Sequence, residues 1–214
     1  IGVRLVGSEM CIRDRVREAL RLTGIESGVE ITTIADIPGQ GTGLGSSSSV
    51  TVGLLNAMHA FQGREVSKEQ LAEEACQIEI DTLGAPIGRQ DQYAASFGGV
   101  NSIRFGENGV QVEPIEVSEG LTKKFSENFT LVFTGLTRSA SKVLSEQSDD
   151  ESDKNSRMAE IRKHADEAAS HIEHGDLDSL GAILNQTWIS KRGVSSMITN
   201  CLLYTSPSPR DGLL

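Results

Sequence analysis

The sequence lacks apolar runs long enough to cross a membrane, and cysteine is scarce in it. No stretch approaches the roughly 20 apolar residues that span a bilayer. Two of the three cysteines, Cys11 and Cys201, lie in terminal segments that we predict to be foreign to the protein. Only Cys76 then remains, which excludes an internal disulfide and a cysteine-based zinc site. A reducing, cytoplasmic setting without a membrane partner is therefore expected.

Basic residues are outnumbered as well. Lysine and arginine total 20 against 30 aspartates and glutamates, which gives a formal net charge of −10. So acidic a chain repels polyanions, and we expect no nucleic-acid partner. Phosphate groups can still be bound locally, by backbone N–H groups and a few well-placed cations.

Both ends of the chain match synthetic DNA. The run from Cys201 to Asp211 matches the translation of a transposon-end adapter that is used in DNA sequencing libraries. The run from Leu5 to Asp14 matches the translation of the opposite strand of the same oligonucleotide. We therefore predict that residues 1–15 and 201–214 are adapter-derived, and we exclude them from inferences about the fold.

The residues that follow alternate between strand-like and helix-like patterns. Residues 29–34 are rich in β-branched side chains and predict a strand. After a glycine-rich loop, apolar residues recur at helical spacing over residues 46–61. The expected inner face of this helix consists of Val50, Leu54, Met58 and Phe61.

Further elements follow from capping and turn patterns. Ser67 and Gln70 fit a capping box at the start of a helix that should end before Gly84. Residues 106–109 predict a hairpin turn between strands at 100–105 and 110–117. A compact apolar stretch at 129–133 predicts another strand, and residues 139–189 read as helical and highly charged, with a last helix beginning at Asp176.

Residues 38–49 carry the strongest chemical signal. Their glycines let the backbone approach a ligand closely, and the helix that begins at the serines directs N–H groups toward the same space. This arrangement predicts an anion site, most naturally for nucleotide phosphates. The segment fits neither the Walker loop nor the dinucleotide-binding spacing. A flexible glycine-serine linker is disfavoured, because the helix continues directly from it.

The same segment resembles the ATP-binding motif of the GHMP kinases, Pro-x-x-Gly-x-Gly-Leu-Gly-Ser-Ser. The residues expected to bind the nucleotide are Pro38, Gly41, Gly43, Leu44, Gly45, Ser46, Ser47 and Ser48. A second matching stretch contains Glu79, then Pro-x-Gly-x-x-Asp-Gln at residues 86–92 and Ala-Ala-Ser-Phe-Gly-Gly at residues 94–99.

The resemblance implies ATP and Mg²⁺ as cofactors. It implies that Glu79 and a loop serine, Ser47 or Ser46, hold the ion, whose preferred ligands are hard oxygens. Asp91 would orient or deprotonate the acceptor hydroxyl. Without the resemblance, Glu79 and Asp91 would read as ordinary solvated acids.

A closer likeness is to the bacterial D-glycero-D-manno-heptose 7-phosphate kinases. It is carried by residues 84–95, residues 134–140 and the helix of Trp188, and it extends over essentially all of residues 16–200. It implies transfer of the ATP γ-phosphate to the anomeric hydroxyl of that sugar phosphate, on a route to nucleotide-activated heptose. Arg138, Arg89 and Gln90 are the expected substrate contacts, because arginine grips phosphate through two hydrogen bonds; a surface role for Arg138 remains the alternative.

Two other functions stay open. The same chemistry on another sugar, such as fucose, would not require a cationic pocket around Arg138. A nucleotide and sugar sensor without catalysis is disfavoured, because a pure binder needs neither Glu79 nor Asp91.

The resemblance implies an α+β chain with the GHMP kinase fold. Residues 16–125 would form a ribosomal protein S5 domain 2-like N-terminal domain without its first strands. Residues 126–200 would begin a ferredoxin-like C-terminal domain and leave it incomplete. Because the family's first strand and its C-terminal glycine-rich motif are not found here, we predict that the chain as written is a poor catalyst or an inactive one.

Overall fold

The structure is a computed structural model, and it describes residues 10–33, 44–130 and 151–193. The chain divides into two compact units, one holding the described residues up to Ile103 and the other those from Arg104 onward. Helices dominate both, and the described residues form one two-stranded sheet. The predicted α+β class is confirmed.

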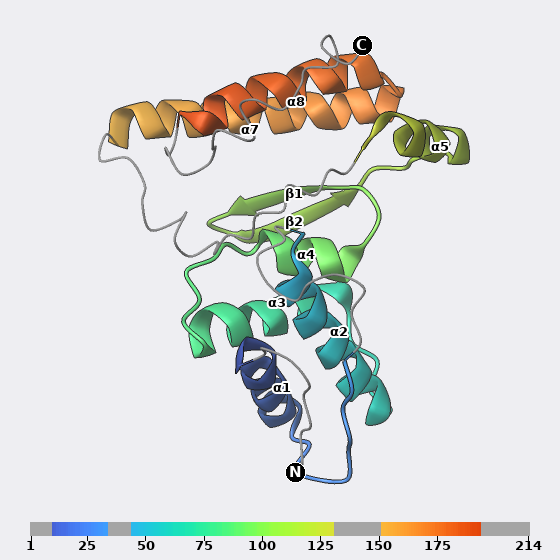
Figure 1. Cartoon of the computed structure of the whole chain (residues 1–214), viewed down its shortest axis with the longest axis vertical. Coiled ribbons are helices and arrows are strands. Elements are labelled where there is room, and N and C mark those ends of the chain that lie inside the picture. Colours follow the sequence, from blue (N-terminus) through green and yellow to red (C-terminus); the bar gives the residue numbers. More distant parts are fainter. Residues whose placement is uncertain (1–9, 34–43, 131–150, 194–214) are drawn as a thin grey trace, which may run out of the picture. The chain divides into compact units, whose positions relative to one another are not determined.

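The first unit is built around one helix, α2 (Ser46–Phe61). It packs against α1 (Met10–Thr23), α3 (Lys68–Cys76) and α4 (Gln90–Phe97) (Figure 1). A single π-helical turn, η1 (Gln77–Thr82), continues α3 and also contacts α1.

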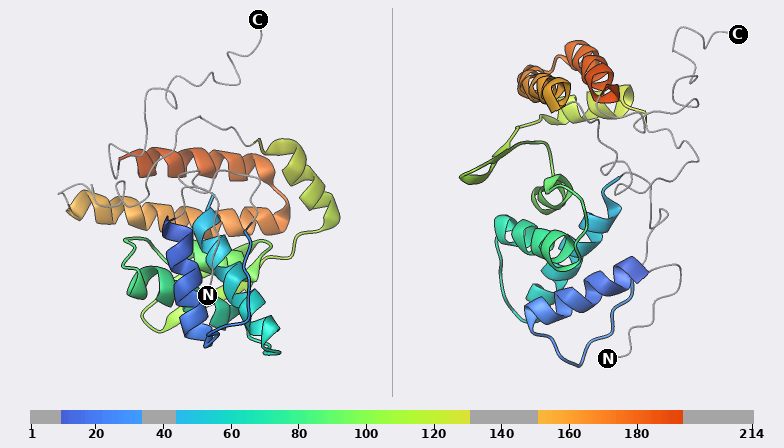
Figure 2. Two further views of the ribbon diagram at one scale, coloured as in Figure 1. Left: turned by 60° about the horizontal axis from the view of Figure 1, so that its bottom comes forward. Right: turned by 90° about the vertical axis from the view of Figure 1, so that its left-hand side faces the viewer.

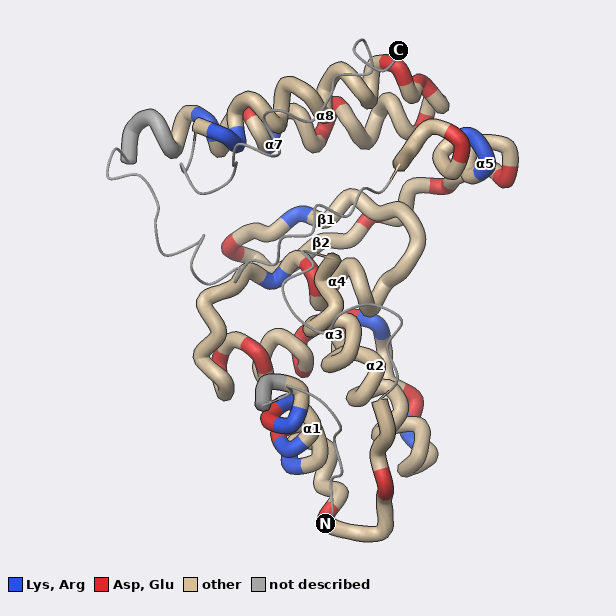
Figure 3. Tube along the Cα trace, in the orientation of Figure 1, with Lys and Arg blue, Asp and Glu red and all other residues tan. Residues whose placement is uncertain are grey.

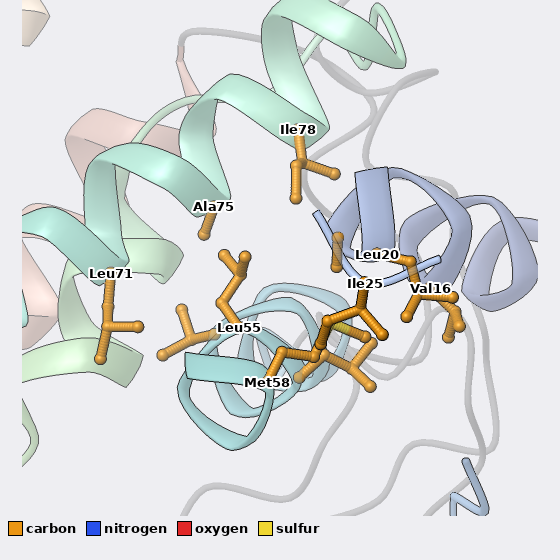
Figure 4. Packing of buried hydrophobic residues seen from close by; sticks show 11 residues of the cluster. Val16, Leu20, Ile25, Leu55, Met58, Leu71, Ala75 and Ile78 are labelled. Carbon is orange, nitrogen blue, oxygen red and sulfur yellow. The ribbon is translucent and has the colours of Figure 1, made fainter. Parts of the chain in front are cut away.

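The core of this unit lies where α2 meets α1 and α3. Leu55 and Ala75 are fully buried, and Val16 on α1 is equally inaccessible. Figure 4 shows the side chains of α2 meeting those of α1 on one side and those of α3 and η1 on another. Burial of a leucine side chain stabilises a fold by about 1.5–3 kcal/mol, so this junction holds the first unit together.

The helix predicted at residues 46–61 is confirmed, and Leu54 and Met58 of its predicted inner face are buried. Phe61 was expected inside as well and is 66% exposed. Thr51, Leu55 and His59 are buried in addition. Apolar spacing alone gave too narrow a buried face, because helices on several sides of α2 bury polar positions as well as apolar ones.

The predicted helix signals around α3 are confirmed. Ser67 caps the helix by accepting a hydrogen bond from the Gln70 backbone N–H at 3.1 Å. The helical run ends at Thr82, and Gly84 follows with φ of +64°. Similarly, Asp176 caps the last helix by accepting from the Ser179 N–H at 3.1 Å.

The strand predicted at residues 29–34 was wrong for the part described. Residues 29–33 are not in a strand, and residue 34 lies outside the described residues. A strand needs a partner to take up its backbone hydrogen bonds. In the described part of the chain, the two strands pair only with each other.

The predicted hairpin is confirmed, as β1 (Asn101–Gly106) and β2 (Gly109–Pro114). The second strand ends at Pro114, before the expected residue 117, because proline has no N–H for the ladder. The sequence analysis missed α5 (Glu119–Asn128), which Ser118 caps through the Leu121 N–H.

In the second unit, α7 (Glu151–His174) and α8 (Leu177–Arg192) pack side by side (Figure 2). They confirm the described part of the predicted helical stretch. Of the strand predicted at 129–133, Phe129 and Thr130 are described and are not in a strand; the rest lies outside the described residues. No helix in the described ranges has the length and apolar character of a membrane span.

Helix α1 runs across residue 15, where the predicted adapter-derived segment ends. The structure does not test whether residues 1–15 are adapter-derived, because that depends on the DNA, so the adapter origin stays a prediction. The predicted domain boundary after residue 125 stays a prediction too.

Candidate functional site

The site is organised around the first turn of α2. Gly45 precedes this turn with φ of +65°, a left-handed conformation that glycine adopts without strain. A glycine cap brings no side chain, so the carboxylate or hydroxyl that usually blocks a helix start is absent at this position. The positive end of the α2 dipole lies here, and it favours an anion.

Asp91 lies against that helix start. A Cβ placed on Gly45 would stand 3.2 Å from the Asp91 Cγ and 3.4 Å from its Oδ2. Asp91 belongs to the first turn of α4 and is solvent-exposed. The structure thus brings the predicted catalytic carboxylate to the end of the predicted phosphate loop, although 46 residues separate the two positions in the sequence.

The second predicted acid, Glu79, lies in the interior with no exposed surface. Its Oε2 accepts hydrogen bonds from Ser48 Oγ at 2.7 Å and from Gln92 Nε2 at 2.6 Å. Its Oε1 accepts from Arg15 Nε at 2.7 Å and from Thr51 Oγ1 at 3.1 Å. We call Glu79 and these four donors the Glu79 cluster.

Each member of the Glu79 cluster comes from an element of the first unit. Ser48 and Thr51 lie one turn apart on α2, Gln92 is on α4, and Arg15 is on α1. Glu79 itself lies in η1, a widened turn of the kind that often occurs at functional sites. Buried charges persist only when they are paired and hydrogen-bonded, so these contacts tie the four segments together.

The Glu79 cluster also fixes the segment that carries Asp91. Gln92 is fully buried and faces Glu79, whereas its neighbour Asp91 faces outward toward Gly45. Holding Gln92 inside therefore sets the position of Asp91 at the start of α2.

Some of the other predicted site residues lie outside the described residues, and the rest lie at the starts of α2 and α4. Pro38, Gly41, Gly43 and Arg138 lie outside the described residues. Leu44 is exposed at 48%, Ser46 and Ser47 are partly buried, and Gln90 is exposed. The backbone carbonyl of Ser47 accepts from Thr51 Oγ1 at 3.1 Å.

Arg89 has other partners in this structure. It pairs with Glu73 and lies 5.6 Å from the centroid of the Tyr93 ring. The Tyr93 hydroxyl donates to Glu73 as well, and burial followed by that hydrogen bond raises the pKa of Tyr93. A role for Arg89 in binding substrate stays a prediction, as does that of Arg138.

The residues around Glu79 fit a hard divalent cation in their chemistry. The carboxylate and the two hydroxyls supply only oxygen, which Mg²⁺ prefers. Gln92 Oε1 is buried and has no hydrogen-bond partner, so it is a further oxygen that a cation would satisfy. Among the described residues, no group of three or more His, Cys, Asp or Glu side chains could hold a metal, which leaves a site with one carboxylate.

Sequence reasoning missed Arg15, Thr51 and Gln92. Thr51 could have been found, since it lies three residues after Ser48 and shares its helix face. Arg15 gave no signal, because 64 residues separate it from Glu79.

Comparison with known proteins extends these observations. The sequence model of the GHMP kinases N terminal domain matches residues 10–99. A D-glycero-alpha-D-manno-heptose 7-phosphate kinase of Campylobacter jejuni is 32% identical over 171 residues, covering 78% of this chain and 50% of the relative. The chain thus spans about half the length of that relative.

A second curated protein and a solved structure, both named as sugar or sugar-phosphate kinases, are also similar to this chain. The L-fucokinase/L-fucose-1-P guanylyltransferase of Bacteroides fragilis is 27% identical over 185 residues, covering 82% of this chain and 19% of the relative. The crystal structure of a D-glycero-D-manno-heptose 1-phosphate kinase from Bacteriodes thetaiotaomicron superposes with a TM-score of 0.71 at 27% identity. That superposition covers 90% of this chain and 58% of the other.

Proposed function

The chain belongs to the GHMP kinases, and we propose that the protein transfers the γ-phosphate of ATP to a hydroxyl group of a sugar phosphate. The observation that carries the proposal is the approach of Asp91 to Gly45 at the uncapped start of α2. A carboxylate beside a helix start that favours anions can receive the proton of an acceptor alcohol where the phosphates would lie.

The helix start of α2 binds the phosphates in this proposal. Its N–H groups and dipole stabilise negative charge without any positioned lysine. Phosphoryl transfer needs positioning and charge stabilisation more than covalent chemistry, which suits a site built from backbone groups and one carboxylate.

Asp91 orients the acceptor hydroxyl and takes its proton as the phosphoryl group arrives. Its exposure leaves it accessible to a substrate, and its closeness to Gly45 keeps it near the transferred group. General base catalysis of this kind contributes typically 10²–10⁴-fold to a rate.

Mg²⁺ is part of the proposal, with Glu79 and a hydroxyl of the first turn of α2 as its protein ligands. When bound, the ion supplies positive charge that offsets the charge of the phosphates. The hydroxyl is that of Ser47, as the family motif implies, or that of Ser48, which already contacts Glu79.

We propose D-glycero-D-manno-heptose 7-phosphate as the acceptor, phosphorylated at its anomeric hydroxyl. The product would feed the synthesis of nucleotide-activated heptose, in the cytoplasm where ATP is abundant. The name of the Campylobacter jejuni relative supports this acceptor, and that of the heptose 1-phosphate kinase supports a heptose phosphate more generally. The fucokinase, whose match covers 82% of this chain, favours fucose as the second candidate.

The experiment is a coupled assay of ADP release. The protein that is assayed is expressed from the full reading frame, recovered from the source DNA. Heptose 7-phosphate, fucose and other sugars serve as acceptors. Turnover with heptose 7-phosphate is expected, and Asp91→Asn should lower kcat by roughly 10²-fold or more with unchanged ATP affinity. Asp81→Asn is the matched control, because Asp81 is an exposed aspartate of the same unit and should leave kcat unchanged.

The outcomes separate the candidates. Turnover with fucose alone would keep the phosphotransferase and replace the acceptor. ATP binding without turnover of any sugar would favour the sensor. An Asp91→Asn variant as fast as the unmodified protein would overturn the role of Asp91.

A further inference from the structure

The carboxylate of Glu73, on α3, connects two residues of α4. The Arg89 guanidinium donates to both oxygens of Glu73, and the Tyr93 hydroxyl donates to one of them. Arg89 and Tyr93 also meet directly, since the guanidinium lies 5.6 Å from the centroid of the Tyr93 ring. We call Glu73, Arg89 and Tyr93 the Glu73 network.

The surroundings of the Glu73 network explain why it forms. Acidic residues recur along α3 and η1, and Lys68 is the one basic residue of these two elements (Figure 3). A guanidinium forms strong hydrogen bonds with a carboxylate. Tyr93 is 3% exposed, and its ring stacks on that of Phe97 with the centroids 6.2 Å apart. Because one member is a packed, buried ring, the network is better ordered than an isolated surface ion pair, which contributes little.

Asp91 lies between the two α4 residues of this network. Arg89 is the cap residue of α4 and Tyr93 follows it one turn later, so both lie on the same side of the helix. Asp91 is halfway between them in the sequence, which places it on the opposite side. That side meets the start of α2, where a Cβ added to Gly45 would stand 3.2 Å from the Asp91 Cγ.

The first turn of α4 is therefore held from two directions. Gln92 is fully buried and donates to Glu79, while the Glu73 network holds Arg89 and Tyr93 against α3. A contact at one position alone leaves a helical turn able to rotate about its axis, and a second contact on another side prevents that rotation. A displacement of about 1 Å at a reacting group can lower a rate by roughly 10²-fold.

We propose that Glu73 is a positioning residue of the kinase reaction. By holding Arg89 and Tyr93 against α3, it keeps the Asp91 carboxylate where the acceptor hydroxyl is bound. The inference rests on the proposed function, because it takes Asp91 as the group that receives the proton. It makes Arg89 part of this positioning, and the predicted direct contact of Arg89 with the substrate is the alternative that the test separates from it.

The test compares the unmodified protein with Glu73→Gln in the ADP-release assay, both expressed from the full reading frame. Glu73→Gln should lower kcat by about tenfold, with the KM for ATP and for the acceptor unchanged. The Glu73 side chain is 53% exposed, so its substitution should leave the protein folded. Glu69→Gln is the matched control, because Glu69 is an exposed glutamate one turn earlier on α3 and should leave kcat unchanged.

Combined variants show whether Glu73 acts through Asp91. Adding Glu73→Gln to Asp91→Asn should cause little further loss of kcat, because no base is left to be misplaced. Tyr93→Phe removes one of the two donors to Glu73 and should lower kcat less than Glu73→Gln does. If Glu73 served only the stability of the fold, Glu73→Gln would lower kcat by the same factor with and without Asp91, and the proposal would be overturned.

Hydrogen exchange separates this inference from the proposed function, because it needs neither nucleotide nor sugar. Glu73→Gln should raise the amide exchange rate of residues 88–97 several-fold and leave that of α2 unchanged. If the unmodified protein turns over no sugar, the proposed function fails. Faster exchange in the variant then still supports the hold of Glu73 on α4, and unchanged exchange overturns it.

The kinetic outcomes are equally distinct. An unchanged kcat in Glu73→Gln would overturn the positioning role and leave the kinase activity in place. A raised KM for the sugar phosphate with unchanged kcat would also overturn it, in favour of a direct contact between Arg89 and the substrate that Glu73 merely orients.

Discussion

Two features of the structure call for glycine at position 45, the backbone conformation and the closeness of Asp91. Its φ of +65° belongs to the left-handed region, and its missing Cβ leaves room for the Asp91 carboxyl. A side chain here would be strained by the backbone and would meet Asp91 at 3.2 Å. The glycine is therefore needed for the conformation of the loop and for the position of the carboxylate.

Gly45→Ala should lower the free energy of unfolding by about 1–2 kcal/mol, because alanine disfavours positive φ. Urea unfolding followed by circular dichroism measures the change. Gly53→Ala is the matched control, since Gly53 lies inside α2 with nothing within 4 Å of an added Cβ. It should stabilise the helix by up to about 1 kcal/mol, and a similar loss at both sites would contradict the interpretation.

Cys76 on α3 is a free thiol that lies buried in the first unit. It is 5% exposed, and burial raises the pKa of its thiol. Because the thiolate is the reactive form, a raised pKa lowers its fraction at a given pH.

In a chain that carries Cys11→Ser and Cys201→Ser, iodoacetamide should modify Cys76 several times more slowly in the folded state than in urea. The rate in the folded state should rise as the pH is raised above 8, since the thiolate fraction grows. Mass spectrometry of timed samples follows the reaction. Equal rates in folded and unfolded chains would mean that the thiol is accessible.

At the scale of elements, α3 shows how one hydroxyl sets a helix start. Ser67 accepts from the Gln70 N–H, and the Gln70 side chain turns to Glu74 instead of back to Ser67. The capping box predicted from the sequence is thus half formed, and the serine carries the cap.

Ser67→Ala should cost about 1 kcal/mol of unfolding free energy, because a helix N–H loses its acceptor. Ser67→Asp should retain most of the stability, since aspartate is an equally good cap. Ser49→Ala is a further control: Ser49 Oγ donates to the Gly45 carbonyl inside an existing helix turn, so its loss should cost less. Chemical denaturation of the three variants compares them, and an unaffected Ser67→Ala variant would contradict the cap assignment.

Most elements with a local signal were predicted, although α5 with its cap at Ser118 was missed, and the elements that depend on neighbours were not predicted. The hairpin turn at residues 106–109 and the caps at Ser67 and Asp176 follow from short-range hydrogen bonds and backbone preference. The strand expected at residues 29–34 needed a partner strand. The apolar period of α2 placed Leu54 and Met58 correctly and Phe61 wrongly, because the packing of the other helices decides which positions are covered.

At the scale of the whole molecule, we expect the core of the first unit to contribute much of the free energy of unfolding. Leu55 is one of its largest fully buried side chains. Leu55→Ala should cost about 2–5 kcal/mol, since the side chain is fully buried between α2 and its neighbours. That is a large part of the roughly 5–15 kcal/mol typical of a domain. Phe61→Ala, on the same helix, should change the free energy of unfolding by less than about 0.5 kcal/mol, because Phe61 is 66% exposed. Urea unfolding ranks the two, and a reversed order would show that the buried face of α2 is assigned incorrectly.

The sequence by itself determined the family. The glycine-rich segment and the Pro-x-Gly-x-x-Asp-Gln stretch led to the GHMP kinases, and the family match at residues 10–99 together with the heptose 1-phosphate kinase structure confirms that fold. Such motifs are readable because contiguous residues specify both a backbone conformation and its chemistry.

Only the tertiary structure decided which side chains surround Glu79 and where Asp91 lies. Arg15, Ser48 and Gln92 are 64, 31 and 13 residues from Glu79 in the sequence. No local preference encodes such meetings, because they arise when α1, α2 and α4 bury their faces against one another. A buried carboxylate then takes whichever donors and cation that packing brings within reach, and in this chain the cation is Arg15.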